Sequence, residues 1–537
     1  MQVTQQNCKA GCRRGVTFSR HHAYRSHCIH NPTRAPNHAS ISPLKAAAIA
    51  TDVSADSWYT GPVAIPRQVD GIEIAMLQGK GRGMVATRDF APGDVVMSTP
   101  PLVLVTSPHR QRPSGELVVD EILERKLYGS KWFSVLYDGS SRSCKPHFGF
   151  GAAAEADASG ETAAAAAADA PRPAGPPEPM LASTSAPAAS AAASKPTAAA
   201  AAAPKKKGFL ASRAAARRTG AAAGGAAGGT ATGSGSSAAE ALPLPDKREQ
   251  TRLAKIVKFN CFGDDAEDLA ASACRGEEPR GHIGLWPEFA LLNHSCAPNT
   301  VNFVVGGAMV VRAVRNIRAG EEVSISYLGR PQLLPFQRRM QALKEDYGFD
   351  CDCVRCTAEQ AHYDKLDDVY LELFEAVEGK LGPAFLEARR EGNMEAVAEV
   401  QQELQGWLRR LYGIFRKTLL APDVRQYVIA SMYDAYDLAF SCAAALGQGE
   451  DASSLQACLK AMEAVSAGSD LHVILAVRYF DWCVREHGEG SALTELARGS
   501  LRRAHVARYG PVSGEVMAKL VDNNRALHIS TNNGTEA

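Results

Sequence analysis

Three closely spaced cysteines constrain the fold of this chain more than any other feature of its sequence. Cys351, Cys353 and Cys356 form the pattern CDCVRC. Three thiolates at this spacing are typical of a zinc site, and tetrahedral zinc needs a fourth ligand. Cys296 is the best candidate, because it is a single cysteine in an upstream loop of small residues, NHSCAPNT.

A zinc ion shared by Cys296 and the 351–356 loop would fix the NHSC segment, so that metal binding would contribute to the folding free energy. The alternative is that Cys296 is a small buried apolar side chain, as many free cysteines are. The chain has thirteen cysteines, an odd number with no other regular spacing. This pattern argues against a secreted disulfide framework and for a reducing compartment.

Composition divides the 537 residues into folded and unfolded parts. Residues 139–245 are dominated by Ala, Gly, Ser and Pro, with too few large apolar side chains to offset the entropy of ordering. We expect a disordered insertion there, inside a domain rather than between two domains. The net charge of +1 gives no overall attraction to nucleic acid or membrane. No stretch approaches the roughly 18 uninterrupted apolar residues of a membrane span.

Two segments resemble targeting signals. Residues 1–51 contain several Arg and Lys but no acidic residue, a composition typical of a plastid or mitochondrial transit peptide. The alternative is an ordinary disordered basic terminus. The basic island of the insertion, PKKK followed by Arg213, Arg217 and Arg218, resembles a bipartite nuclear-import signal, or else a solubilising charge cluster. We therefore expect a chloroplast or mitochondrial location, with nucleus or cytoplasm as the alternative.

Short strands joined by glycine turns predict a β-rich domain that begins near Ile65. Strand patterns with Gly or Pro turns occupy residues 65–105 and 285–330, as in a compact, irregular β-domain. The glycine turn QGKGRG can bring its backbone close to a ligand. Helical spacing appears near residues 115–138 and in KREQTRLAKIVKFNCF, whose helix should end near Asn260.

Residues 360–524 show a different pattern, a succession of amphipathic helices broken by Gly or Pro. Short connections predict antiparallel helix pairs in a tetratricopeptide-like array, although the sequence signature of that repeat is absent. Residues 525–537 should form a disordered tail. The predicted fold class is α+β, with an all-α domain after the β-rich domain and its zinc segment.

Five motifs in order resemble a known family. GKGRGMVAT, KFNCF, GLWPEFALLNHSCAPN, GEEVSISY and YGFDCDCVRC are closely similar to the split SET domain and post-SET segment of the SET-and-MYND-finger (SMYD) protein lysine methyltransferases. The resemblance divides the SET domain between residues 65–138 and 246–330, places the post-SET zinc segment at 331–357, and extends faintly to the helical C-terminus. The MYND zinc finger has no recognisable counterpart, because region 106–250 holds a single cysteine, Cys144.

The resemblance implies roles for individual residues. Lys80, Gly81 and Arg82, in the glycine turn, would lie near the methionine part of S-adenosylmethionine. The remaining implied positions are cofactor contacts at Asn260, Asn293 and His294, an adenine-stacking ring at Phe349, a catalytic tyrosine at Tyr327, and a wall of the lysine channel at Tyr347. Ala290 replaces a serine of the family, which would alter the substrate lining. Zinc held by Cys296, Cys351, Cys353 and Cys356 would be structural, because four thiolates leave no open position.

The leading hypothesis is a protein lysine N-methyltransferase that uses S-adenosylmethionine and acts on a histone tail or another protein. A channel walled by Tyr327 and Tyr347 would desolvate the lysine and favour its nucleophilic neutral form. Tyr327 would orient the amine, because the ordinary tyrosine pKa of about 10 makes a poor general base. We expect a monomer that binds neither membranes nor nucleic acid directly.

Two alternatives remain open. One is a plastid SET enzyme related to the Rubisco large-subunit methyltransferases, although that group lacks the CxCxxC segment. The other is a catalytically silent scaffold whose helical domain binds peptides.

Overall fold

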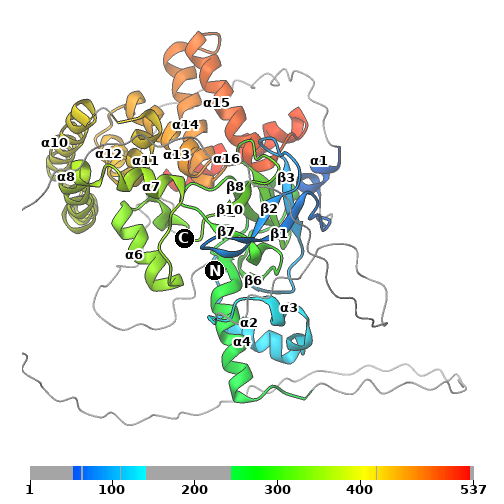
Figure 1. Cartoon of the computed structure of the whole chain (residues 1–537). Coiled ribbons are helices and arrows are strands. Elements are labelled where there is room, and N and C mark those ends of the chain that lie inside the picture. Colours follow the sequence, from blue (N-terminus) through cyan, green and yellow to red (C-terminus); the bar gives the residue numbers. More distant parts are fainter. Residues whose placement is uncertain (1–52, 62–63, 109, 141–242, 419, 533–537) are drawn as a thin grey trace, which may run out of the picture. The chain divides into compact units, whose positions relative to one another are not determined.

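The computed structural model describes residues 53–61, 64–108, 110–140, 243–418 and 420–532 (Figure 1). The expected transit peptide, the basic island and almost all of the expected insertion lie outside these residues. The expected absence of a MYND finger concerns the same region and stays a prediction.

Three small sheets form the β-rich part of the chain. A four-stranded sheet has the order β1 (Ile72–Leu77), β2 (Gly81–Ala86), β10 (Glu322–Ile325) and β7 (Asn293–His294). A second sheet has the order β3 (Val95–Thr99), β9 (Ala308–Ala313) and β8 (Thr300–Val305). The third has the order β4 (Val103–Ser107), β6 (Gly281–Leu285) and β5 (Cys261–Asp264). Segments before and after the insertion share all three sheets, so the insertion interrupts a domain.

The strand pair β7 and β10 brings two of the sequence motifs together. The strands are parallel, with Ser324 opposite Asn293 and Ile325 opposite His294. On its other edge β10 pairs antiparallel with β2, through Glu322 opposite Val85. The GEEVSISY strand therefore lies between the glycine turn and the NHSC motif.

Short helices surround the sheets. α4 (Lys247–Asn260) starts at Asp246, whose carboxylate accepts a hydrogen bond from the Glu249 backbone N–H at 2.7 Å, and it ends at Asn260 as predicted. The helical stretch expected near 115–138 is broken into α2 (Gly115–Glu124), the 3₁₀ turn η1 (Leu127–Gly129) and α3 (Trp132–Val135). The break follows Lys126, whose φ of 54° is left-handed and cannot continue a right-handed helix.

Both expected limits of the folded region need correction. The fold begins before Ile65, because α1 (Val53–Thr60) buries Trp58 and Tyr59 in a cluster with residues of β8, β9 and α16 (Gly514–Asn532). The tail predicted from residue 525 is helical as far as Asn532, and Leu527 packs against the same cluster. Apolar side chains at helical spacing extend α16 beyond the predicted end.

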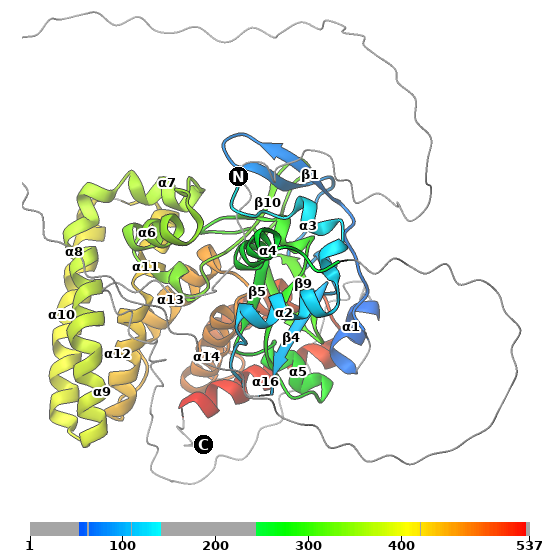
Figure 2. The ribbon, with the colours of Figure 1, turned by 90° about the horizontal axis from the view of Figure 1, so that it is seen from below.

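The C-terminal region is helical, and the predicted α+β class is confirmed. One short helix, α5 (Leu269–Arg275), lies between β5 and β6, and three more follow β10: η4 (Arg330–Leu333), α6 (Phe336–Tyr347) and α7 (Val354–Gln360). The C-terminal region then contains α8 (Tyr363–Ala376), the π turn η5 (Val377–Leu381), α9 (Gly382–Glu391), α10 (Met394–Thr418), α11 (Pro422–Ser431), α12 (Tyr433–Ala445), α13 (Ala452–Val465), α14 (Asp470–His487) and α15 (Ala492–Tyr509). Figure 2 shows α8, α10 and α12 side by side, and they share one apolar core. The tetratricopeptide-like character of the helical region stays a prediction. Among the described helices, none is long and apolar enough to cross a membrane.

Candidate methyl-transfer site and metal centre

The four predicted metal ligands come together in one cluster. The Sγ atoms of Cys296, Cys351, Cys353 and Cys356 all lie within 4.8 Å of one another, and those of Cys296 and Cys356 are 3.5 Å apart. Sulfurs bound to zinc at about 2.3 Å in a tetrahedron stand about 3.8 Å from each other. Hydrogen bonds from the other three cysteines hold the pKa of the Cys296 thiol well below its ordinary value. The cluster therefore fits a tetrahedral zinc ion.

Two buried arginines stand beside the cysteine cluster. Arg339 on α6 and Arg355 on α7 are fully buried, and both pair with Glu359, at 2.8 and 2.9 Å. Nη2 of Arg339 also lies 3.8 Å from Sγ of Cys356, and Nη1 of Arg355 donates to the Cys296 carbonyl at 3.2 Å. Four thiolates around one zinc ion carry two net negative charges, whereas two guanidiniums and one carboxylate carry one net positive charge. These residues therefore compensate part of the charge of a zinc-thiolate centre.

The imidazole of His294 connects the cluster to the predicted catalytic tyrosine. Its Nδ1 accepts a hydrogen bond from the Tyr327 backbone N–H at 3.0 Å, and its Nε2 lies 3.2 Å from Sγ of Cys296. Because Nδ1 acts as an acceptor, the neutral ring carries its proton on Nε2 and donates it to the sulfur. Both ring nitrogens are thus engaged by the protein. A cofactor contact of His294 would have to use its backbone or its ring carbons.

Tyr327 lies at the centre of a group of rings. It is almost fully buried, and its hydroxyl donates to the Leu292 carbonyl at 2.7 Å. The rings of His294, Tyr347 and Phe349 lie 5.1, 5.3 and 6.5 Å from it, centroid to centroid. The Tyr347 hydroxyl donates to the Tyr327 carbonyl at 3.3 Å. The position of Tyr327 is therefore fixed both at its hydroxyl and at its backbone.

A second group joins the glycine turn to Asn293. Glu322 accepts a hydrogen bond from Lys80 Nζ on one carboxylate oxygen, at 2.8 Å, and from Asn293 Nδ2 on the other, at 3.0 Å. The pKa of the Lys80 ammonium is raised: burial is the largest single effect and lowers it, but the hydrogen bond to Glu322 and the negative charges of Glu322 and Asp352 together outweigh burial. Gly81 has a left-handed φ of 74°, which glycine adopts without strain.

The other two predicted cofactor residues meet a different segment. Arg82 is buried and donates to the Val135 carbonyl at the end of α3. Nδ2 of Asn260 donates to the Tyr137 carbonyl at 2.8 Å and to the Ile256 carbonyl at 2.7 Å. The Asn260 Oδ1 is buried and has no hydrogen-bond partner among the described residues. An acceptor buried in this way suits a ligand that brings its own donor, such as the amine of an adenine or of an amino acid.

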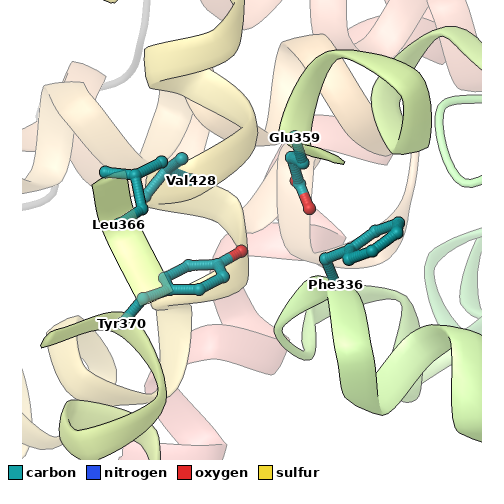
Figure 3. Close-up of a pocket in the computed structure, with 5 residues that line it drawn as sticks. All are labelled: Phe336, Glu359, Leu366, Tyr370 and Val428. Atoms are coloured by element: carbon teal, nitrogen blue, oxygen red, sulfur yellow. The ribbon is translucent and has the colours of Figure 1, made fainter. Parts of the chain in front are cut away.

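A small cavity lies beside Glu359, the partner of the two buried arginines, and none of the rings around Tyr327 lines it. It has a volume of about 10 Å³ and is lined by Phe336, Glu359, Leu366, Tyr370 and Val428. Figure 3 shows the Glu359 carboxylate and the Tyr370 hydroxyl facing the same space. The volume is that of about one water molecule, so this cavity cannot admit a lysine side chain.

Sequence reasoning missed the residues that hold the others in place. Glu322 lies in the GEEVSISY motif, but neither of its two glutamates stands out as a site residue from sequence alone. The Arg355 and Glu359 pair was detectable as oppositely charged residues four apart on a helix. Arg339 gave no signal, because its partner Glu359 lies on another helix.

Comparison with known families identifies one domain in the chain. The family model for the SET domain matches residues 81–328, from the start of β2 to just beyond Tyr327. The chain therefore contains a SET domain, and segments before and after the insertion both contribute strands to all three sheets described above.

Several lysine methyltransferases are similar to part of the chain. Histone-lysine N-methyltransferase SMYD3 of Mus musculus is 41% identical over 93 residues, which are 17% of this chain and 21% of that protein. N-lysine methyltransferase SMYD2-A of Danio rerio is 37% identical over 128 residues, 24% of this chain and 26% of that protein. SMYD2-B of Xenopus laevis is 40% identical over 114 residues, 21% and 24% of the two chains. The chain is thus similar to SMYD2 and SMYD3 proteins over part of its length, and it spans about a quarter of the length of these relatives.

Proposed function

We propose that this protein is an S-adenosylmethionine-dependent protein lysine N-methyltransferase. The SET domain and the similarity to proteins named as lysine methyltransferases support this function. The observation that carries it is the setting of Tyr327, which is held by Leu292 and His294 and flanked by Tyr347 and Phe349. This setting presents a fixed hydroxyl among aromatic rings, as the alignment of a desolvated amine requires.

The methyl donor supplies a methyl group on a positively charged sulfur. The substrate lysine nitrogen forms the new C–N bond with its lone pair while the C–S bond breaks, and the sulfur keeps that electron pair as a thioether. The amine must lose a proton to water before it attacks, because an ammonium has no lone pair. The protein's task is mainly positioning, which is worth several kcal/mol in an in-line displacement.

The chain's own residues can perform this positioning. The Tyr327 hydroxyl donates its hydrogen bond to the Leu292 carbonyl, so its oxygen is free to accept a hydrogen bond from the lysine amine or a weak contact from a polarised methyl C–H. Tyr327 and Tyr347 would exclude water from the lysine channel and so favour the neutral amine, while Phe349 would stack on the adenine. Asn260, Asn293 and Lys80 offer the polar groups that a zwitterionic, adenosine-bearing donor needs.

Zinc would be the structural part of this site. Cys296, Cys351, Cys353 and Cys356 would hold it, and His294 would link its Cys296 thiolate to the Tyr327 backbone. Hydrogen bonds from residues around the ligands tune and orient zinc centres in this way.

The substrate would be a protein lysine, on a histone or on an organellar protein. The N-terminal composition supports an organelle and the basic island of the insertion supports the nucleus. A fluorescent fusion lacking residues 1–51 distinguishes them: loss of organellar signal supports import, and unchanged nuclear signal supports the basic island.

The test of the function is transfer of labelled methyl groups from S-adenosylmethionine by the purified full chain to histones and to organellar extracts. Tyr327→Phe should reduce kcat at least about tenfold, the cost of one lost alignment interaction, or change the number of methyl groups added. Tyr479→Phe on α14 is the matched control, since it removes a hydroxyl that accepts a hydrogen bond from Gln456 in the helical region. The control should transfer at the parent rate.

Two outcomes would contradict the proposal. A parent that binds the cofactor but transfers no methyl group would favour the alternative of a silent scaffold. A Tyr327→Phe enzyme with unchanged rate and product would refute the role of Tyr327.

A further inference from the structure

The glutamate at the start of β10 occupies a central position in the site. Glu322 lies in the strand between β2 and β7, opposite Val85 of β2, while Ser324 of the same strand lies opposite Asn293 of β7. Its side chain therefore reaches the glycine turn on one side and the NHSC motif on the other. Both neighbouring segments carry residues predicted to contact the methyl donor.

The Glu322 carboxylate uses each of its oxygens for one of these residues. Oε2 accepts from the Lys80 ammonium at 2.8 Å and Oε1 from the Asn293 carboxamide at 3.0 Å. The side chains of Lys80 and Glu322 are 33% and 22% exposed, so the pair is partly shielded from water. Asp352, between two of the cysteines, adds a weaker and exposed partner 3.7 Å from the Lys80 Nζ.

This arrangement fixes which atoms remain available to a ligand. A lysine ammonium has three donors, so Lys80 keeps donors for an anion after it has bound Glu322. Asn293 donates to Glu322 through Nδ2, which orients its Oδ1 as an acceptor on the other side of the amide. A carboxylate and an ammonium on one carbon would satisfy both residues.

The adjacent glutamate does not share this role. Glu321 forms an ion pair with Arg315 at 2.6 Å on the surface, and it contacts neither Lys80 nor Asn293. The two glutamates of the GEE motif thus differ in their partners, although they are neighbours in sequence. Glu321 provides a matched control.

We propose that Glu322 is a positioning residue for the amino-acid end of the methyl donor. This inference rests on the proposed function. Glu322 holds Lys80 and Asn293 in their binding orientation before the ligand arrives, so that less rotamer freedom is lost on binding. Gln at this position offers one acceptor oxygen instead of two, and its NH₂ group opposes one of the two donors.

The experiment compares two ligands that differ only at the amino-acid end. S-adenosylhomocysteine carries the carboxylate and the ammonium, whereas 5′-methylthioadenosine lacks both. Calorimetry on the full chain should show that Glu322→Gln lowers the affinity for S-adenosylhomocysteine at least about tenfold, the effect of losing one charge-assisted hydrogen bond. Binding of 5′-methylthioadenosine should change by less than about twofold, and Glu321→Gln should leave both affinities at the parent values.

A second variant tests whether Glu322 acts through Lys80. Lys80→Met should by itself lower the affinity for S-adenosylhomocysteine. Glu322→Gln should cause a smaller further loss of affinity in that background than in the parent, because the two residues share one interaction. If the two substitutions lower the affinity additively, Glu322 does not act through Lys80. Lys80 is partly exposed, so its variant remains informative if Glu322→Gln fails to fold.

The outcomes separate this inference from the proposed function. If Glu322→Gln lowers the affinity for both ligands equally, or for neither, the positioning role is overturned even in an active methyltransferase. If the parent binds neither ligand, both proposals are wrong. If it binds both but transfers no methyl group, only the proposed function fails.

Discussion

At the scale of single residues, Gly83 shows how closely the glycine turn and the NHSC motif approach each other. A Cβ at position 83 would lie 2.4 Å from Asn293 Nδ2 and 2.5 Å from Leu77 Cδ1. Asn293 is buried and held by Glu322, so it cannot move without losing that bond. We expect Gly83→Ala to displace the Asn293 amide and to lower the affinity for S-adenosylhomocysteine at least about tenfold, as measured by calorimetry. The same substitution should lower the free energy of unfolding by about 1–3 kcal/mol.

The control is the same substitution in an uncrowded place. Gly406 lies inside α10, and beyond the backbone of its own helix turn no atom of the described residues stands within 4 Å of a Cβ built there. Gly406→Ala should stabilise the protein by about 0.5–1 kcal/mol, because alanine loses less backbone entropy in a helix, and should leave ligand affinity unchanged. Unchanged affinity in Gly83→Ala would show that the close approach has no role in binding.

The sequence predicted residues that belong to a motif better than residues that act through a partner. Tyr327, Tyr347 and Phe349 do meet in one group, and the four cysteines do cluster. The bonds of His294 to Cys296 and Tyr327 and the two bonds of Glu322 depend on the register of β7 and β10. A two-residue strand such as β7 leaves no periodic pattern in the sequence.

At the scale of elements, the cysteine cluster brings the loop after β7 together with the start of α7, since Cys351 and Cys353 precede that helix and Cys356 lies in its first turn. The purified protein should contain about one zinc per chain by atomic emission, and Cys353→Ser should lose it, because an alcohol is a poor zinc ligand beside three thiolates. The variant should also melt at a lower temperature, since metal binding contributes to folding.

The control for this prediction is Cys274→Ser. Cys274 lies on α5, is only partly buried, and is not part of the cluster. Its replacement should leave both the metal content and the melting temperature close to those of the parent. A folded parent without metal would contradict the assignment of the four thiolates.

The elements themselves were predictable where their pattern was long and periodic. α4 and the helices after residue 360 follow from apolar spacing alone, and the strands near the glycine turn follow from alternation and turn residues. α1 was not predicted, because its eight residues are too few to show a period and its stability comes from Trp58 and Tyr59 packing on distant segments. Tertiary packing, not local propensity, decides such short elements.

At the scale of the molecule, buried charges join the SET part to the helical part. Arg508 on α15 donates to Asp268, the residue before α5, at 2.6 Å and to the Gly468 carbonyl at 3.0 Å. Near the cysteine cluster, Arg355 donates to Ser431 of α11 at 2.7 Å. Breaking such a buried pair costs about 3–5 kcal/mol, so the two parts should unfold together.

Buried histidines in both parts should make this common stability depend on pH. Burial lowers the pKa of His282 to about 4, of His472 to about 3 and of His505 to about 4. In the unfolded chain a histidine takes up a proton below about pH 6.5, while the folded protein keeps these rings neutral. The unfolded state therefore binds more protons between pH 6.5 and 4, and these groups stabilise the fold above that window and lose this contribution as the pH falls through it.

His282→Phe isolates one of these contributions. His282 packs between Phe262 and Trp286, with ring centroids 6.0 and 6.2 Å away, so a phenyl ring can replace it without a new polar group. Urea unfolding at several pH values should show a shallower loss of stability between pH 6.5 and 4, by at most about 1.4 kcal/mol per pH unit. Phe262→Leu disturbs the same packing without removing a titrating group, and it should lower stability equally at every pH. An identical pH profile for His282→Phe and the parent would show that His282 is protonated in the folded protein as readily as in the unfolded chain.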